Sequence, residues 1–257
     1  MKVAAIQADL AWCDQESNRV NLWNQMKDAG QCDLYVLPEM FSTGFCTNDK
    51  SMAEPLNADG TCASLDWMIK CSNELDAAIV GSVALSTREG CKNRLYFVRP
   101  DGSFEYYDKR HLFSYGGEDG LFSAGKERVI VEYNGWRFLL AVCYDLRFPK
   151  RLRNGLDTNG KPEYDAMLIV ASWPEKRRYA WDILIRARAI ENQAYVVAVN
   201  RVGDDPSCHY SGGSAIIDFA GNTITSSDKE SVLQGELDKE ELNAFREHFP
   251  FLMDADI

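Results

Sequence analysis

The sequence predicts an α/β fold built on mixed β-sheets, and two features of the hydrophobic pattern lead to this prediction. Short apolar segments typical of strands lie at residues 3–8, 34–37, 77–85, 95–99, 129–132, 138–143, 166–172, 195–200 and 214–218. Most of them are continuous apolar runs without polar alternation, as expected for sheets that are covered on both faces. Segments with helical periodicity lie among them, at residues 18–29, 63–74, 178–192 and 239–248.

The order of these elements indicates how the strands pair. Early in the chain each predicted strand is followed by a helix, whereas turn sequences in the middle, such as Asn134-Gly135, indicate hairpins. We therefore expect parallel and antiparallel pairs within the same sheet. The sequence contains no low-complexity linker and no fixed-period repeat, so a single domain over residues 1–257 is the simplest organisation.

Composition and charge exclude several classes of partner. Hydrophobic residues make up 46% and charged residues 26% of the chain, as in globular proteins with a sizeable core. The formal net charge is −11, and the basic cluster Lys176-Arg177-Arg178 is too short to follow a phosphate backbone, so we expect no nucleic-acid partner. No segment approaches the ~20 apolar residues of a membrane span. The N-terminus has no signal-type apolar stretch, so we expect a cytoplasmic protein without a membrane partner.

The cysteines suggest a reducing compartment. They stand at positions 13, 32, 46, 62, 71, 91, 143 and 208, without a Cys-x-x-Cys pair, and the chain is long enough to fold without disulfides. Most are expected to be small buried side chains. The cysteines and the histidines at positions 111, 209 and 248 have no metal-ligand spacing, so we expect no metal and no cofactor.

Cys143 differs from the other cysteines by its position in the pattern. It ends the apolar run 138–143 and precedes Tyr144-Asp145-Leu146-Arg147-Phe148-Pro149, which predicts a strand-to-helix turn. Such a turn exposes the sulfur and brings backbone N–H groups that stabilise a thiolate and an oxyanion. Cys143 is therefore a candidate nucleophile, although a buried structural cysteine is the alternative.

Three charged residues are candidates to assist this nucleophile. Glu39 ends an apolar strand in Leu37-Pro38-Glu39, a position that suits a general base. Lys109, in Asp108-Lys109-Arg110-His111, can place an ammonium against an oxyanion. Glu118, in a glycine-rich loop, can orient that lysine. Viewed singly, Glu39 is better explained as an ordinary strand-end glutamate that faces solvent, and Lys109 as part of a solvated charge cluster. Glu118 is alternatively a simple loop acid.

Together these segments resemble the nitrilase superfamily of carbon–nitrogen hydrolases. Leu-Pro-Glu, Lys-x-His-Leu-Phe and Cys-Tyr-Asp-x-Arg-Phe-Pro occur in the family's order, and its Glu-Lys-Cys triad falls on Glu39, Lys109 and Cys143. The family's supporting glutamate falls on Glu118. Residues 4–7, 171–174 and 186–193 also look like family segments, so the resemblance covers nearly the whole chain.

Within the superfamily the chain is most similar to a bacterial branch of the omega-amidases, through residues 39–45, 143–149 and 246–256. Such enzymes use water to deamidate 2-oxoglutaramate or 2-oxosuccinamate, giving the dicarboxylate and ammonia. The resemblance implies a four-layer αββα sandwich and a homodimer, with helix 178–192 and the apolar tail 249–253 at the interface. It also implies a cysteine thioester, with the oxyanion held by Lys109 and the backbone N–H of Tyr144.

The substrate contacts and the protonation state are less defined by the sequence. Arg147 is a candidate cation for a substrate carboxylate, with a buried ion pair as its alternative. Phe41, Tyr115 and Trp173 are candidate pocket walls, each alternatively a core residue. A glutamate beside the cysteine disfavours a thiolate whereas a lysine favours it, so the resting state of the nucleophile stays open.

Three other functions are compatible with the residues. The chain can be another small aliphatic or carbamoyl amidase of the same superfamily. A thiol hydrolase that pairs its cysteine with a histidine is a second alternative. A non-catalytic interaction protein on the same scaffold is the third, and the intact Glu39, Lys109 and Cys143 argue against it.

Overall fold

The computed structural model describes residues 1–255, so Asp256 of the predicted tail segment lies outside the described residues. Its first sheet has the strand order β15-β1-β2-β4-β5-β6, with β3 beside β4. The bounds are β1 (Lys2–Gln7), β2 (Leu34–Val36), β3 (Glu54–Pro55), β4 (Ala78–Thr87), β5 (Gly90–Val98), β6 (Phe104–Asp108) and β15 (Ser231–Glu236). β1, β2 and β4 pair in parallel, whereas β4, β5 and β6 pair antiparallel, so the sheet is mixed as predicted.

The second sheet has the order β14-β13-β10-β9-β8-β7. Its strands are β7 (Ile130–Tyr133), β8 (Trp136–Val142), β9 (Ala166–Val170), β10 (Tyr195–Val199), β13 (Ser214–Ile217) and β14 (Thr223–Ser227). A small separate hairpin is formed by β11 (Val202–Asp204) and β12 (His209–Ser211). The central strands β8, β9 and β10 are parallel and, apart from Arg137 near the start of β8, apolar, which is expected where helices and a second sheet cover both faces.

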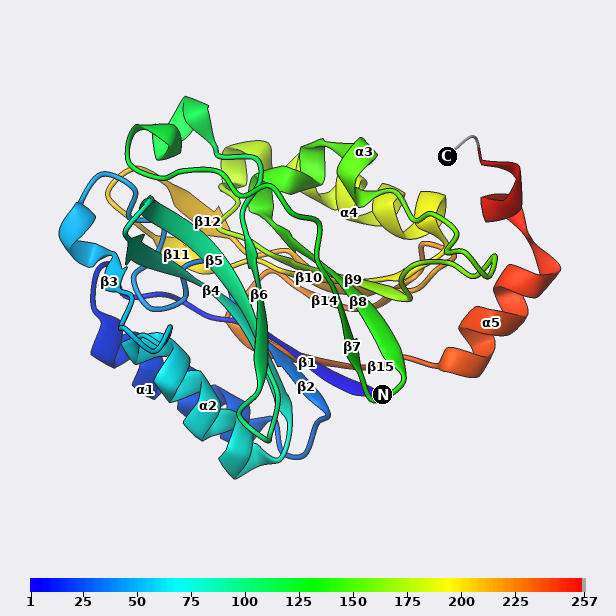
Figure 1. The fold of residues 1–257 in the computed structure, drawn as a ribbon, viewed down its shortest axis with the longest axis horizontal. Helices are drawn as coiled ribbons and strands as arrows, with labels where there is room; N and C mark the ends of the chain where they lie inside the picture. The colour runs from blue at the N-terminus through cyan, green and yellow to red at the C-terminus, as the bar shows by residue number, and fades with distance from the viewer. Residues whose placement is uncertain (256–257) are drawn as a thin grey trace.

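The helices lie outside the two sheets, as Figure 1 shows. They are α1 (Gln15–Asp28), α2 (Ala63–Leu75), α3 (Pro149–Leu152), α4 (Arg178–Asn192) and α5 (Lys239–His248). α1 and α2 cover the first sheet, and α3 and α4 cover the second (Figure 1). The four-layer αββα sandwich expected from the sequence is therefore confirmed. Among residues 1–255, no helix combines the length and the apolar character that crossing a membrane requires.

The packing explains why strand β1 reads as a continuous apolar run. Side chains of a strand alternate between its two faces. Val3 and Ala5 belong to the core between the two sheets, whereas Ala4 and Ile6 pack with α1 and α2. Both faces of this strand are thus buried, and neither tolerates a polar residue without a partner.

The strands that the apolar pattern missed include three at sheet edges. β6 and β15 end the first sheet and β14 ends the second, so each has only one neighbouring strand in its sheet. β14, with the sequence Thr-Ile-Thr-Ser-Ser, is largely exposed, so its sequence does not need the apolar run that marks a central strand. The predicted helices 178–192 and 239–248 match α4 and α5, whereas α1 begins earlier than predicted because the carboxylate of Asp14 accepts a hydrogen bond from the Ser17 N–H.

Candidate active site

The residues singled out by the sequence meet where several strands end. Glu39 follows β2, Lys109 follows β6, and Cys143 follows β8. β2 and β6 run in the same direction within the first sheet, since each pairing from β4 to β6 reverses the direction. The carboxyl ends of parallel strands meet at one edge of a sheet, which is the usual location of sites in α/β proteins.

Cys143 occupies a strained backbone position at the end of β8. Its φ is 45°, in the left-handed region that a side chain with a Cβ rarely adopts. A short 3₁₀ segment, Cys143–Arg147, begins there and is fastened to the strand because Asp145 accepts a hydrogen bond of 3.0 Å from the Val142 N–H. The reversal of the backbone takes Cys143 out of the strand register, and its side chain lines a cavity.

A buried charge cluster surrounds the amino group of Lys109. Its Nζ lies 2.8 Å from Glu39 Oε1 and 2.8 Å from Glu118 Oε2, and all three side chains are inaccessible to solvent. Asn93 of β5 donates from Nδ2 to Glu39 Oε1 at 2.8 Å and to Glu118 Oε1 at 3.1 Å. The structure therefore brings the three predicted charged residues together and adds an asparagine that holds both carboxylates.

Backbone groups fix the two carboxylates further. The N–H of Ser172, two residues after the end of β9, donates to Glu39 Oε2 at 2.8 Å. The Phe113 N–H donates to Glu118 Oε2 at 2.6 Å. Hydrogen bonds to charged groups are the stronger ones, so these two glutamates are held in place independently of Lys109.

The electrostatics of the cluster set the protonation states of Lys109 and Cys143. Burial lowers the pKa of Lys109, but the carboxylates of Glu118 and Glu39 outweigh this effect and raise it, so the side chain stays an ammonium. Burial raises the pKa of Cys143 well above its ordinary value, and the Glu39 carboxylate adds to the increase while Lys109 opposes it. The two opposing influences recognised in the sequence therefore resolve in favour of a neutral thiol.

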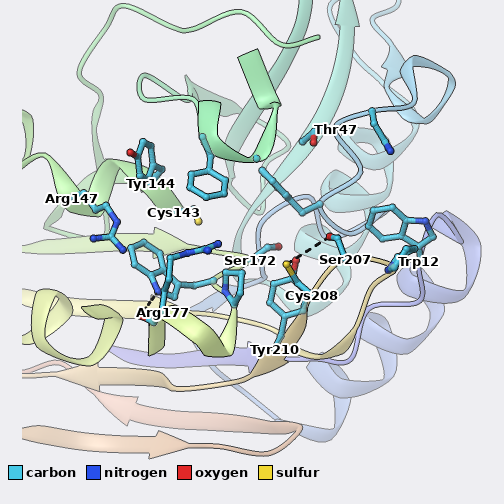
Figure 2. A pocket seen from close by; sticks show the side chains of 17 residues that line it. Trp12, Thr47, Cys143, Tyr144, Arg147, Ser172, Arg177, Ser207, Cys208 and Tyr210 are labelled. Atoms are coloured by element: carbon cyan, nitrogen blue, oxygen red, sulfur yellow. Dashed lines mark hydrogen bonds between the residues drawn. The ribbon is translucent and has the colours of Figure 1, made fainter. Parts of the chain in front are cut away.

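The cavity beside Cys143 has a volume of about 240 Å³. Aromatic side chains form much of its wall, and Figure 2 shows them with the polar residues between them. The lining includes Trp12, Phe45, Phe113, Cys143, Tyr144, Arg147, Ser172, Trp173, Arg177, Cys208 and Tyr210. A mostly apolar cavity with a few polar groups beside a nucleophilic side chain is typical of a small-molecule site.

Of the predicted substrate contacts, two line this cavity and two do not. Arg147 and Trp173 line it, with the guanidinium carbon 4.8 Å from the indole ring centroid. Phe41 is fully buried between the first sheet and its helices, where it packs on Trp67, so its assignment to the pocket wall was wrong. The assignment of Tyr115 was also wrong, because its side chain is 88% exposed on a short turn.

Several residues of the site escaped the sequence analysis, among them Asn93 and Arg177. Asn93 is a polar residue buried within β5, and a buried amide must have hydrogen-bond partners there. In the sequence, an asparagine just before an apolar run is only a weak indication of such a role. Arg177 was read only as part of a basic cluster, but it lines the cavity. Within residues 1–255, the cavity lining contains no histidine, and no three His, Cys, Asp or Glu side chains are grouped as metal ligands.

Comparison with known proteins agrees with this fold and identifies its family. The carbon-nitrogen hydrolase family matches residues 2–247. The chain is 44% identical to omega-amidase YafV of Yersinia enterocolitica, over 100% of this chain and 97% of that protein. It is 33% identical to 2-oxoglutaramate amidase of Bacillus subtilis (strain 168), over 89% and 86% of the two chains.

A solved structure extends the comparison. XC1258 from Xanthomonas campestris, described as a CN-hydrolase superfamily protein with an arsenic adduct in the active site, is 41% identical to this chain. The two structures have a TM-score of 0.95, and the match covers 100% of this chain and 97% of the other. The protein therefore belongs to the carbon-nitrogen hydrolase family, as the Glu-Lys-Cys pattern of its sequence predicted.

Proposed function

We propose that this protein is an omega-amidase that hydrolyses the terminal amide of a small dicarboxylate monoamide, 2-oxoglutaramate or 2-oxosuccinamate, to the acid and ammonia. The names of the relatives at 44% and 33% identity support this substrate class. The observation that carries the proposal is the buried ammonium of Lys109, held between Glu39 and Glu118 beside a cavity lined by Cys143.

In the first half-reaction, Glu39 accepts the proton of the Cys143 thiol while the sulfur attacks the amide carbonyl carbon. The raised pKa of Cys143 requires such a base, because a neutral thiol is a poor nucleophile. The carbonyl oxygen becomes an oxyanion, which the Lys109 ammonium and the Tyr144 backbone N–H stabilise. When the C–N bond breaks, Glu39 returns the proton to the departing nitrogen, and ammonia leaves a thioester on Cys143.

In the second half-reaction, water replaces ammonia. Glu39 removes a proton from the water as its oxygen attacks the thioester carbonyl, and the same groups stabilise the second oxyanion. The C–S bond then breaks, the sulfur recovers the proton from Glu39, and the carboxylic acid product leaves. Glu39 therefore handles every proton transfer in both half-reactions.

Glu118 and Asn93 act through their neighbours in this scheme. Glu118 holds Lys109 Nζ at 2.8 Å, which keeps the ammonium in place when Glu39 becomes protonated. Asn93 donates to both carboxylates and so fixes their positions relative to one another. We therefore assign a positioning role to both.

We also propose that the chain is a single domain, that it forms a homodimer and that it is cytoplasmic. One core cluster contains residues of both sheets and of α4, which supports a single domain over residues 1–257. Phe251 and Met253 are 59% and 64% exposed, which supports a homodimer that covers them. The free cysteines of the chain support a reducing, cytoplasmic location.

The test is ammonia release from 2-oxoglutaramate and 2-oxosuccinamate by the wild type and by Cys143→Ala. Cys13→Ala is the matched control, because Cys13 is half-buried and does not line the cavity. We expect release by the wild type and by Cys13→Ala, and none by Cys143→Ala. Ammonia release from butyramide, but from neither oxo acid amide, would show that the substrate is an uncharged aliphatic amide and not the proposed carboxylated amide. No release from any amide would support a non-catalytic scaffold.

A further inference from the structure

Arg147 and Arg177 bring two positive charges into the same cavity. Both residues line it together with Cys143, and Figure 2 shows both at the Tyr144 end, away from Trp12. Among residues 1–255, neither guanidinium has a carboxylate within salt-bridge distance or a hydrogen-bond acceptor. Arg178, the next residue in the chain, is by contrast paired with Asp182 and Asp228.

Aromatic rings hold the two guanidinium groups in place. The guanidinium carbon of Arg147 lies 4.8 Å from the ring centroid of Trp173, and that of Arg177 lies 4.9 Å from the ring of Phe113. The Trp173 indole N–H also donates to the Arg177 carbonyl oxygen at 2.8 Å, which joins the two arginines through one residue. Contact with a ring face leaves the N–H edges of a guanidinium free to bind a carboxylate with two parallel hydrogen bonds.

The two unpaired arginines stand in surroundings that are otherwise negatively charged. The whole chain has a formal net charge of −11, and the buried cluster beside Cys143 contains two carboxylates for one ammonium. An anionic substrate is repelled by such surroundings unless cations stand at its charged end. An uncharged amide needs no cation for binding. Two guanidiniums without carboxylate partners would therefore not strengthen the binding of such a substrate in this cavity.

We propose that Arg147 and Arg177 form a carboxylate clamp that selects amides with a carboxylate at the far end over uncharged amides. This inference rests on the proposed amidase function and identifies the residues that determine its specificity. Arg147 is four residues after Cys143 in the same 3₁₀ segment, so the clamp lies at a fixed distance from the nucleophile. The clamp therefore also selects the length of the carbon chain between carboxylate and amide.

The test compares kcat/KM for 2-oxosuccinamate, 2-oxoglutaramate and uncharged butyramide in Arg147→Gln and Arg177→Gln. Lys176→Gln is the matched control, because it removes the same charge from an exposed neighbour that does not line the cavity. Each arginine variant is expected to lose about 10- to 100-fold for the carboxylated amides, as for one lost hydrogen bond to a charged group. Butyramide turnover is expected to stay unchanged, and the control is expected to match the wild type. Arg177→Lys is expected to recover part of the loss.

Two outcomes would overturn the clamp. Equal losses for charged and uncharged amides would assign the arginines a structural role, and unchanged kcat/KM for the oxo acids would show that the carboxylate binds elsewhere. A second measurement separates the clamp from the proposed function, namely protection of Cys143 from iodoacetamide by 2-oxoglutarate. If the wild type releases no ammonia, protection that is lost in both arginine variants still supports the clamp, and protection equal in all variants refutes it.

Discussion

His111 Nδ1 lies 2.7 Å from Asp145 Oδ1, and this contact joins the segment of Lys109 to the turn of Cys143. His111 stands two residues after Lys109, and Asp145 two residues after Cys143. The Asp145 carboxylate, which is nearly inaccessible to solvent, also accepts hydrogen bonds from the His111 N–H, the Val142 N–H and the Tyr107 hydroxyl. One carboxylate thus fixes the position of the ammonium relative to the sulfur.

Replacing Asp145 with Asn is expected to lower both stability and kcat. Each carboxylate oxygen accepts from one backbone N–H, Oδ1 from His111 and Oδ2 from Val142. Whichever way the new amide turns, its NH₂ faces one of these donors, which leaves a buried N–H unpaired at a cost of about 1–3 kcal/mol. Thermal unfolding and ammonia-release kinetics measure the two effects.

Tyr107→Phe is the control for this substitution. It removes the hydroxyl that donates to Asp145 and accepts from the Arg110 N–H, but it leaves the bonds from the His111 and Val142 N–H groups to Asp145 in place. Its cost should be about 1–2 kcal/mol, because the part-buried Arg110 N–H loses its acceptor, and kcat should change little. If Asp145→Asn and Tyr107→Phe have the same effect on kcat, the idea that Asp145 positions Lys109 against Cys143 is incorrect.

Lys109→Met is expected to abolish turnover and to destabilise the fold. The variant leaves Glu39 and Glu118 as two buried carboxylates without a cation, and breaking a buried ion pair costs about 3–5 kcal/mol. Glu118→Gln removes one charge but leaves Lys109 paired with Glu39, so its loss of stability should be smaller. Urea unfolding of the two variants tests the ranking, and a smaller loss in Lys109→Met would contradict it.

The pH dependence of Cys143 alkylation is expected to shift in opposite directions in two variants. The Glu39 carboxylate raises the pKa of Cys143 and the Lys109 ammonium lowers it. A thiol becomes a thiolate as pH rises through its pKa, so Glu39→Gln should move the curve of iodoacetamide rate against pH to lower pH. Lys109→Met should move it to higher pH. A curve for Glu39→Gln that stays at the wild-type position would mean that Glu39 does not interact with the thiol.

Substitution of the exposed histidines is expected to leave turnover nearly unchanged. His209 pairs with Asp204 on the β11–β12 hairpin, and His248 ends α5, so neither lines the cavity. His209→Ala and His248→Ala should therefore keep kcat/KM within about twofold, and they should change the free energy of unfolding by less than about 0.5 kcal/mol, as surface substitutions usually do. Loss of activity in either variant, measured by ammonia release, would favour a thiol hydrolase with a Cys-His pair.

The exposed face of α4 is expected to be buried at the interface of a homodimer. Tyr179 and Ile183 are one helical turn apart and are 80% and 48% exposed. Gel filtration of the wild type should give a mass well above the 29.0 kDa of one chain, and Tyr179→Glu with Ile183→Glu should shift it toward that value. Elution of the wild type as a monomer would contradict the expected homodimer.

Sequence patterns predicted the central strands well but missed three of the four strands that end the two large sheets, and the cause is physical. β8 and β9 are buried on both faces, and this burial leaves an apolar run that the sequence displays directly. β14 and β15 lie at sheet edges, where water replaces one neighbour and polar residues are tolerated. Phe41 and Tyr115 illustrate the same limit, since an aromatic residue in the sequence is compatible with a core, a pocket wall or the surface.

The sequence by itself determined the fold class and the residue types of the site, because Glu39, Lys109 and Cys143 each belong to a short motif with a local structure. Only the tertiary structure decided which side chains meet. Asn93 and Arg177 join the site through strands and segments far apart in the chain, and the neutral thiol of Cys143 follows from burial beside Glu39. Local motifs depend on backbone geometry within a few residues, whereas contact and desolvation depend on the whole packed chain.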